Sequence, residues 1–147
     1  METLPTDFKE FIVLLNSHEV RYLIVGGYAV AYHGYPRLTG DIDFCVEVSE
    51  ENAHNLEAVL TDFGFAGLGL TASDFLTPGQ IIQLGYPPHR IDIVTALSGV
   101  DFAEAWKERT AGELGGIPVH FIGKTALLAN KAASGRPKDL ADLDALS

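Results

Sequence analysis

Residues 22–46 read YLIVGGYAVAYHGYPRLTGDIDFCV, and two acidic residues stand inside an otherwise apolar run near the end of this stretch. The stretch opens as a short buried strand that breaks at Gly26 and Gly27 and continues as a helical turn or two. A second apolar strand follows over residues 41–48. The pattern therefore predicts a strand, a glycine turn, a helix and another strand, with carboxylates on the second strand.

The two acidic residues of the second strand are Asp41 and Asp43. Alternate side chains of a strand share a face, so both carboxylates lie on one side of it. The other side is apolar and predicts a core face, formed by Ile42, Phe44, Val46 and Val48. Two carboxylates about 7 Å apart along a strand repel each other, so we expect a positive group between or beside them.

A third carboxylate follows the same logic in the later strand RIDIVTAL, residues 90–97, where Asp92 points away from the core. If the two strands are neighbours, we expect Asp41, Asp43 and Asp92 to converge. Such an oxygen cluster suits Mg²⁺ and can hold two ions about 3.5 to 4 Å apart. The alternative is that Asp41 and Asp43 face solvent and that Asp92 ends an edge strand.

The glycine turn favours the metal interpretation. A strand that stops at Gly26 and Gly27 and opens a helix presents unpaired backbone N–H groups, which suit a phosphate. Phosphates beside a carboxylate-bound metal are typical of phosphoryl or nucleotidyl transfer.

The rest of the chain alternates between helical and strand patterns. This order predicts one α/β or α+β domain over residues 1–147, with a mixed β-sheet partly covered by helices and with helices at its C-terminal end. We expect Asp7 and Ser49 to cap helices and Pro137 to open one. The further helices are predicted at 7–18, 49–63, 101–109, 123–134 and 136–146, and the further strands at 80–85, 90–97 and within 112–122.

Net charge and composition indicate which classes of binding partner the protein can have. Twenty acidic against ten basic residues give a formal charge of −10, which argues against a surface that tracks duplex nucleic acid. No apolar run approaches the roughly 18 residues of a membrane span, the N-terminus lacks the pattern of a signal peptide, and Cys45 is the single cysteine. We therefore expect a cytoplasmic protein without a membrane partner.

Four of the ten basic residues gather in one C-terminal stretch. A local cationic patch on an acidic protein suits a small anion such as a triphosphate. The alternatives are a solvated helix face, or internal neutralisation by Asp139 and Asp142. The four residues are Lys124, Lys131, Arg136 and Lys138.

The stretch VGGYAVAYHGYPRLTGDIDFCV, followed by RIDIV, resembles the signature of the DNA polymerase β-like nucleotidyltransferase superfamily. That signature joins an apolar strand, a Gly-Gly or Gly-Ser pair, about ten further residues, an Asp-x-Asp and a later acidic strand residue. The closing segment LLANKAASGRPKDLADLDAL resembles the C-terminal part of small bacterial members, including toxin-like and antitoxin-like nucleotidyltransferases. The resemblance implies a nucleotidyltransferase-like fold and the transfer of a nucleoside monophosphate from an NTP.

The resemblance also implies roles for individual residues. Asp41 and Asp43 would hold divalent metals, Mg²⁺ or alternatively Mn²⁺. Asp92 would bind the catalytic metal and help to deprotonate the acceptor hydroxyl. Gly26 and Gly27 would cradle the triphosphate.

One departure from the signature concerns the phosphate contacts. Many members with established catalysis carry Ser after the first glycine and an Arg shortly beyond, where this chain has Gly27 and Tyr28. We expect Arg37 and Thr39 to supply the missing contacts, with ordinary turn chemistry as the alternative for both. In the C-terminal stretch, we expect Lys131 and Arg136 to bind the NTP as well.

Three classes of function are compatible with these residues. The favoured one is a metal-dependent nucleotidyltransferase acting on a hydroxyl of a small molecule, RNA or protein. The second is a non-catalytic nucleotide-binding or protein-interaction module on the same fold, which the three intact aspartates disfavour. The third is a D-x-D glycosyltransferase, disfavoured by the short chain and by the glycine turn ahead of the carboxylates. A partner protein or a homodimer would complete the acceptor cleft.

Overall fold

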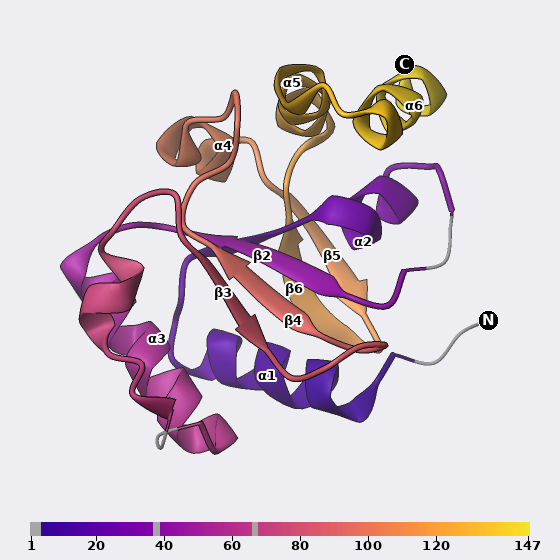
Figure 1. Cartoon of the computed structure of the whole chain (residues 1–147). Coiled ribbons are helices and arrows are strands. Elements are labelled where there is room, and N and C mark those ends of the chain that lie inside the picture. Colours follow the sequence, from indigo (N-terminus) through magenta and orange to yellow (C-terminus); the bar gives the residue numbers. More distant parts are fainter. Residues whose placement is uncertain (1–3, 37–38, 66–67) are drawn as a thin grey trace.

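The computed structural model describes residues 4–36, 39–65 and 68–147. Its centre is a six-stranded mixed sheet with the strand order β3-β4-β2-β1-β6-β5 (Figure 1). The strands are β1 (Tyr22–Val25), β2 (Ile42–Val46), β3 (Ile81–Leu84), β4 (Ile91–Val94), β5 (Thr110–Leu114) and β6 (Ile117–Phe121).

Helices lie on both sides of this sheet. Figure 1 shows α1 (Thr6–Ser17) and α3 (Glu50–Phe63) on one side, with the short 3₁₀ helix η2 (Ala72–Phe75) beside α3. The remaining helices lie on the other side. They are α2 (Gly26–Tyr32), α4 (Phe102–Lys107), α5 (Lys124–Ser134) and α6 (Pro137–Leu146).

The pairing of β2 with its two neighbours positions the predicted site. β1 and β2 are antiparallel, which follows from the short connection through α2. β2 and β4 are parallel, and the chain between them passes through α3, η2 and the strand β3, which runs antiparallel to β4. Two predicted carboxylate strands are therefore neighbours and run in the same direction.

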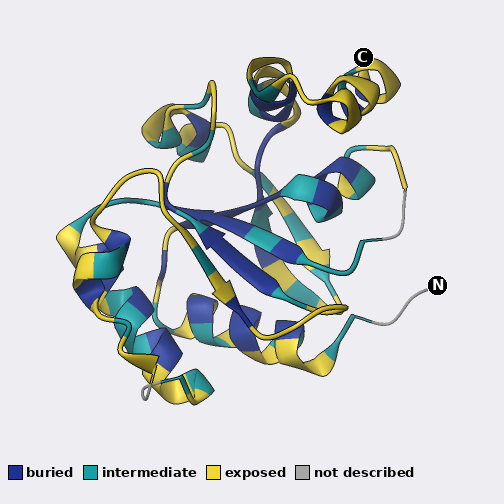
Figure 2. Ribbon diagram, viewed as in Figure 1, coloured by how far each residue is buried: buried dark blue, intermediate teal, exposed yellow. Residues whose placement is uncertain are grey.

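The apolar face of β2 packs on α1. The rings of Phe44 and Phe11 lie 5.5 Å apart, and Ile42, Phe44 and Val46 are buried. Figure 2 shows this dark-blue core between the sheet and the helices, and the exposed edge strand β3 in yellow. Since neighbouring residues of a strand point to opposite faces, Asp43 points to the side of α5 and α6.

The mixed sheet, its partial cover of helices and the C-terminal helices are confirmed. The Ser49 hydroxyl accepts a hydrogen bond from the Asn52 backbone N–H at 3.2 Å, so the predicted cap of α3 is confirmed, and Pro137 opens α6 as predicted. Within the described ranges, no helix has the length and apolar character needed to cross a membrane.

Three local predictions were wrong. The N-cap of α1 is Pro5 and not Asp7, because the proline ring holds φ at −53° and the helix begins directly after it. Asp41 lies immediately before β2, which begins at Ile42. Gly26 and Gly27 do not form a separate turn, because they are the first residues of α2.

Candidate active site

Asp43 and Asp92 lie opposite each other in the register of β2 and β4. Neighbouring strands are about 4.8 Å apart, so the two side chains meet on the same face. The charge of Asp92 acts on Asp43 across this pair. Asp41 precedes β2 on the same face, and all three aspartates line one cleft. The structure thus brings the three predicted carboxylates together.

Arg90 supplies the positive group that the repelling carboxylates require. Its Nε donates to Asp92 Oδ1 at 2.7 Å, and its Nη2 donates to Asp92 Oδ2 at 3.1 Å. The same Nη2 lies 3.1 Å from Asp41 Oδ2. One guanidinium therefore bridges two of the three aspartates. Hydrogen bonding to Asp92 is also the main cause that raises the pKa of Arg90.

Asp43 is in a different electrostatic environment. Burial raises the pKa of Asp43 to about 6, and the neighbouring charges of Asp92 and Asp41 act in the same direction. The positive charge of Lys138 opposes this shift. Asp43 therefore changes its charge near neutral pH and gains from any further cation in the cleft.

The glycine pair at the start of α2 gives the carboxylates room. Gly26 has a φ of +65°, and a Cβ at this position would collide with the Asp43 carboxylate. A Cβ on Gly27 would lie 2.8 Å from Thr39 Oγ1. The Thr39 hydroxyl donates to the Asp41 backbone oxygen at 3.1 Å, so it also has the turn role that we considered as the alternative.

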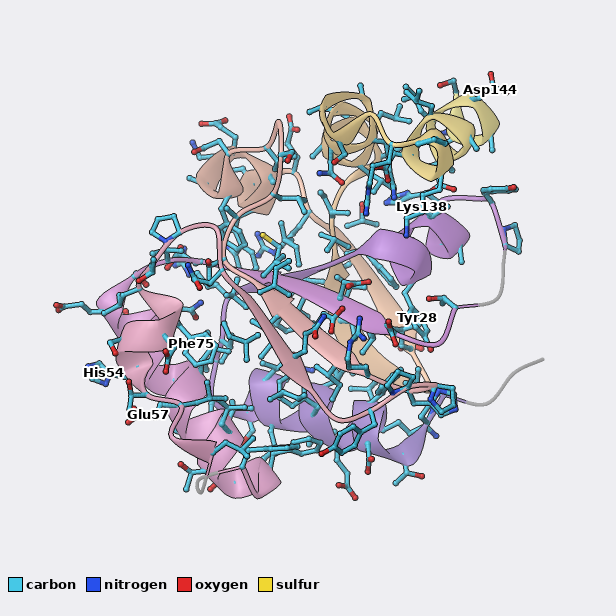
Figure 3. All side chains as sticks on the ribbon, in the orientation of Figure 1. Tyr28, His54, Glu57, Phe75, Lys138 and Asp144 are labelled. Atoms are coloured by element: carbon cyan, nitrogen blue, oxygen red, sulfur yellow. The ribbon has the colours of Figure 1, made fainter. Side chains whose placement is uncertain are left out.

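The aspartates and glycines open onto a cleft of about 930 Å³ between the sheet and the C-terminal helices. Figure 3 shows Lys138 extending from α6 towards the sheet, whereas Asp144 lies on the outer side of the same helix. The residues that line the cleft include Gly26, Gly27, Thr39, Asp41, Asp43, Gln80, Ile81, Gln83, Arg90, Asp92, Lys131, Arg136 and Lys138.

Lys131 lines the cleft but is buried, with 4% of its surface exposed. Its ammonium lies 3.1 Å from Asp142 Oδ2 and 3.4 Å from Asp139 Oδ1, and both aspartates are buried. The internal neutralisation considered from the sequence is therefore present. Because the loss of one partner of a buried ion pair is strongly destabilising, Lys131 has a structural role in the C-terminal helices.

Arg136 also pairs with Asp139, but from an exposed position. Its Nε donates to Asp139 Oδ2 at 2.6 Å, while its side chain remains 64% exposed at the rim of the cleft. Burial alone would raise the pKa of Asp139, but the hydrogen bond from Arg136 and the charge of Lys131 hold it below its usual value. NTP binding by Lys131 and Arg136 stays a prediction.

The sequence reasoning did not assign Arg90 to the site, and it named Lys138 only as a member of the cationic stretch. Arg90 stands two residues before Asp92, so strand alternation already places it on the carboxylate face. Lys138 belongs to the predicted cationic stretch, but only the fold shows that it extends towards Asp43. Lys124 is not among the described residues of the cleft, and Arg37 lies outside the described residues.

The carboxylates have the oxygen chemistry that suits a hard divalent cation. In the described part of the chain, however, no three His, Cys, Asp or Glu side chains are arranged as a metal site. Arg90 engages the oxygens of Asp41 and Asp92 that a cation would use. The donor set therefore fits Mg²⁺ in chemistry, and the guanidinium held against Asp41 and Asp92 opposes a cation at their oxygens.

Solved structures that resemble this arrangement of elements include nucleotidyltransferases. The antibiotic-resistance factor ANT(2'')-Ia matches with a TM-score of 0.60 and 17% identity, over 96% of this chain and 80% of its own. The chain has a nucleotidyltransferase fold.

Two further structures share this nucleotidyltransferase fold. TM1012 of Thermotoga maritima, which is provisionally assigned as a nucleotidyltransferase, matches with a TM-score of 0.63 and 16% identity, over 93% of this chain and 88% of its own. The lincosamide antibiotic adenylyltransferase LnuA, solved with lincomycin, has a TM-score of 0.58 and 14% identity, over 99% of this chain and 98% of its own. No family model and no curated protein matches the sequence.

Proposed function

We propose that this protein is a metal-dependent nucleotidyltransferase that moves a nucleoside monophosphate from an NTP to a hydroxyl group. The observation that carries the proposal is the register pair Asp43 and Asp92, joined by Asp41, in a cleft that also contains the glycine pair. The fold supports it, since ANT(2'')-Ia has been solved with adenylyl-2''-tobramycin and LnuA is an antibiotic adenylyltransferase.

The three aspartates would hold Mg²⁺, with Mn²⁺ as an alternative. A bound divalent ion would neutralise phosphate charge and polarise the α-phosphoryl group. Carboxylates are the ligands that such hard cations prefer. Asp43 gains most from this role, because burial and the neighbouring carboxylates already disfavour its ionised form.

Asp92 would act on the acceptor. The acceptor oxygen attacks the α-phosphorus and forms a new P–O bond, while the bond from the α-phosphorus to the bridging oxygen breaks and pyrophosphate leaves. The Asp92 carboxylate would take the hydroxyl proton once Arg90 no longer occupies its oxygens. Nothing else is oxidised, reduced or consumed.

The triphosphate would lie between the glycine pair and the cationic wall of the cleft. The backbone of Gly26 and Gly27 would approach it closely, and Thr39 would contribute its hydroxyl. Arg136 and Lys138 would contact it from α6, and Lys131 would act mainly through Arg136 by holding Asp139. Arg37 keeps the phosphate role proposed from the sequence.

The acceptor would enter from the side of β3, where the cleft is lined by uncharged residues such as Gln80, Ile81 and Gln83. ANT(2'')-Ia and LnuA have been solved with antibiotics or their adenylylated product, which supports a small hydroxyl-bearing acceptor. A partner protein or a second copy of the chain would complete the acceptor side if the acceptor is larger.

The test is incubation of the protein with α-phosphate-labelled NTPs and Mg²⁺ or Mn²⁺, together with small-molecule, RNA and protein extracts as acceptors. We expect label to move to an acceptor with the wild type and with Asp144→Asn, and not with Asp92→Asn. NTP binding without transfer to any acceptor would instead indicate a non-catalytic module. Parallel reactions with labelled sugar nucleotides test the glycosyltransferase alternative.

A further inference from the structure

Arg90 occupies the carboxylate oxygens that the proposed metal needs. Its guanidinium makes a two-point contact with Asp92, at 2.7 and 3.1 Å, and a third contact with Asp41 at 3.1 Å. A divalent cation at these oxygens would be repelled by the guanidinium held against them and would compete with it for their lone pairs. The site therefore has a built-in competitor of the metal.

The backbone of Arg90 is fixed while its side chain is not confined. The Arg90 backbone N–H donates to Asp41 Oδ1 at 3.3 Å, and its backbone oxygen accepts from the Ile42 N–H at 3.0 Å. The Arg90 side chain is 25% exposed and lines the cleft. Rotation of the side chain alone would therefore release both carboxylates without disturbing the β2–β4 pairing.

The same cleft offers the released guanidinium a new partner. Gly26, Gly27 and Lys138, where the triphosphate would bind, line the cleft together with Arg90. A guanidinium has a planar array of donors that matches phosphate oxygens as well as carboxylate oxygens. The phosphates of a nucleotide that binds together with the metal would thus become the new hydrogen-bond acceptors of the Arg90 guanidinium, in place of the two carboxylates.

We infer that Arg90 is a positioning residue that exchanges partners. It holds Asp41 and Asp92 together in the absence of metal, yields them to the metal, and then binds the phosphates of the nucleotide. This inference rests on the proposed function, and it explains how a cluster of three carboxylates is maintained before any metal arrives. Metal binding and nucleotide binding are consequently coupled through one side chain.

The first test measures metal affinity alone. Mn²⁺ is titrated calorimetrically, without nucleotide, into the wild type, Arg90→Gln and Arg90→Lys. We expect Arg90→Gln to bind Mn²⁺ about tenfold more tightly, since loss of a charge-assisted hydrogen bond corresponds to roughly this factor. Arg90→Lys should fall between the two, because an ammonium is a compact point charge without the guanidinium fork. Thermal unfolding with and without Mn²⁺ verifies that each variant is folded.

The second test measures nucleotide affinity at saturating Mn²⁺, with the α,β-methylene analogues of ATP, GTP, CTP and UTP so that no transfer occurs. We expect Arg90→Gln to bind the preferred analogue about tenfold more weakly than the wild type. Arg90→Lys should recover part of this affinity. The opposite direction of the two effects is not expected of a residue with a merely structural role.

Two results would overturn the inference. Equal or weaker Mn²⁺ binding by Arg90→Gln would show that the guanidinium does not compete with the metal. Unchanged analogue affinity would show that it does not bind the phosphates. Either result leaves the proposed function standing if the wild type binds Mn²⁺ and transfers label, whereas absence of Mn²⁺ binding in all three proteins overturns both.

Discussion

Asp43 lies directly opposite Asp92 on two adjacent parallel strands, and the charge of Asp92 is one of the causes that raise the pKa of Asp43. Burial disfavours the ionised form of Asp43 most, and the neighbouring negative charges add to this effect. Arg90 compensates the charge of Asp92, and no guanidinium contact to Asp43 is among the ion pairs that the structure describes. The ionised form of Asp43 is therefore the charged state that this site disfavours.

Replacing Asp43 by Asn should stabilise the metal-free protein above pH 6. The pKa of Asp43 is about 6 in the folded protein against 3.8 for the ordinary group, so folding favours the protonated form and the ionised form costs stability. The loss of folding free energy is absent below about pH 4 and grows between pH 4 and 6. Above pH 6 it approaches about 3 kcal/mol, because each pKa unit corresponds to 1.36 kcal/mol. Urea unfolding of Asp43→Asn and the wild type at pH 4 and pH 8 measures it.

The matched control for this prediction is Asp144→Asn on the outer side of α6, where the side chain is exposed. Its difference from the wild type should not change between the two pH values. A stability difference for Asp43→Asn that is equally independent of pH would contradict the assignment of the raised pKa.

Gly26→Ala should destabilise the protein for two separable reasons. A residue with φ of +65° is in the left-handed region, which costs about 1 to 2 kcal/mol for a residue with a Cβ. The new Cβ also collides with the Asp43 carboxylate, and overpacking typically costs about 1 to 3 kcal/mol more. Gly64→Ala isolates the first cost, because Gly64 has φ of +97° and, apart from its chain neighbours, no atom of the described residues lies within 4 Å of a Cβ there.

Chemical unfolding of the two glycine variants checks this prediction. We expect Gly26→Ala to lose more stability than Gly64→Ala and to shift the pKa of Asp43, whereas Gly64→Ala should leave that pKa unchanged. Equal losses would mean that Asp43 moves away from the new methyl group without cost.

Alternation of side chains was sufficient to predict the sheet and the shared face of the carboxylates. In β2, Ile42, Phe44 and Val46 are buried on one face of the strand. Since side chains alternate between the two faces, Asp43 had to point to the opposite face. The partner strand could also be inferred, since Asp92 lies in the same pattern. The sequence could not show that β2 and β4 pair in the register that makes the two residues direct neighbours.

The cationic side of the cleft was less predictable. The cationic residues of this stretch are close in sequence but differ in burial. Lys131 is buried and forms ion pairs with Asp139 and Asp142. Arg136 and Lys138 are exposed. Helical spacing predicts on which face of a helix a residue lies, but it does not predict how far its side chain is buried in the protein. The depth of Lys131 depends on how α5 packs against α6, which is a tertiary property.

Lys131→Ala should be among the most destabilising single substitutions in the C-terminal helices. It removes the ammonium that lies 3.1 and 3.4 Å from two buried carboxylates. Removing one partner of a buried ion pair typically costs about 3 to 5 kcal/mol. Lys124→Ala, at an exposed position of the same helix, should change the unfolding free energy by less than about 0.5 kcal/mol. Comparable small losses in both variants would show that the carboxylates find water or another cation.

Lys138→Ala should weaken nucleotide binding, with only a small loss of stability at neutral pH through the further raised pKa of Asp43. Lys138 is exposed at the start of α6, and its charge lowers the pKa of Asp43, so its ammonium acts on the centre of the cleft. An anion bound between the glycine pair and α6 would gain a charge-assisted hydrogen bond from this group, which corresponds to about a tenfold change in affinity. Calorimetric titration of a non-hydrolysable NTP analogue with Mn²⁺ measures this change.

The pKa of Asp43 shows whether Lys138→Ala acts through its charge in the cleft or through an indirect structural change. Since Lys138 opposes the other causes that raise the pKa of Asp43, its removal should move that pKa further up, as followed by carboxyl-carbon NMR in the metal-free protein. Lys124→Ala removes the same charge from a helix start outside the described lining of the cleft, so it should change neither quantity. If Lys138→Ala raised the pKa of Asp43 but left nucleotide affinity intact, the phosphates would bind on the Arg90 side of the cleft and away from α6.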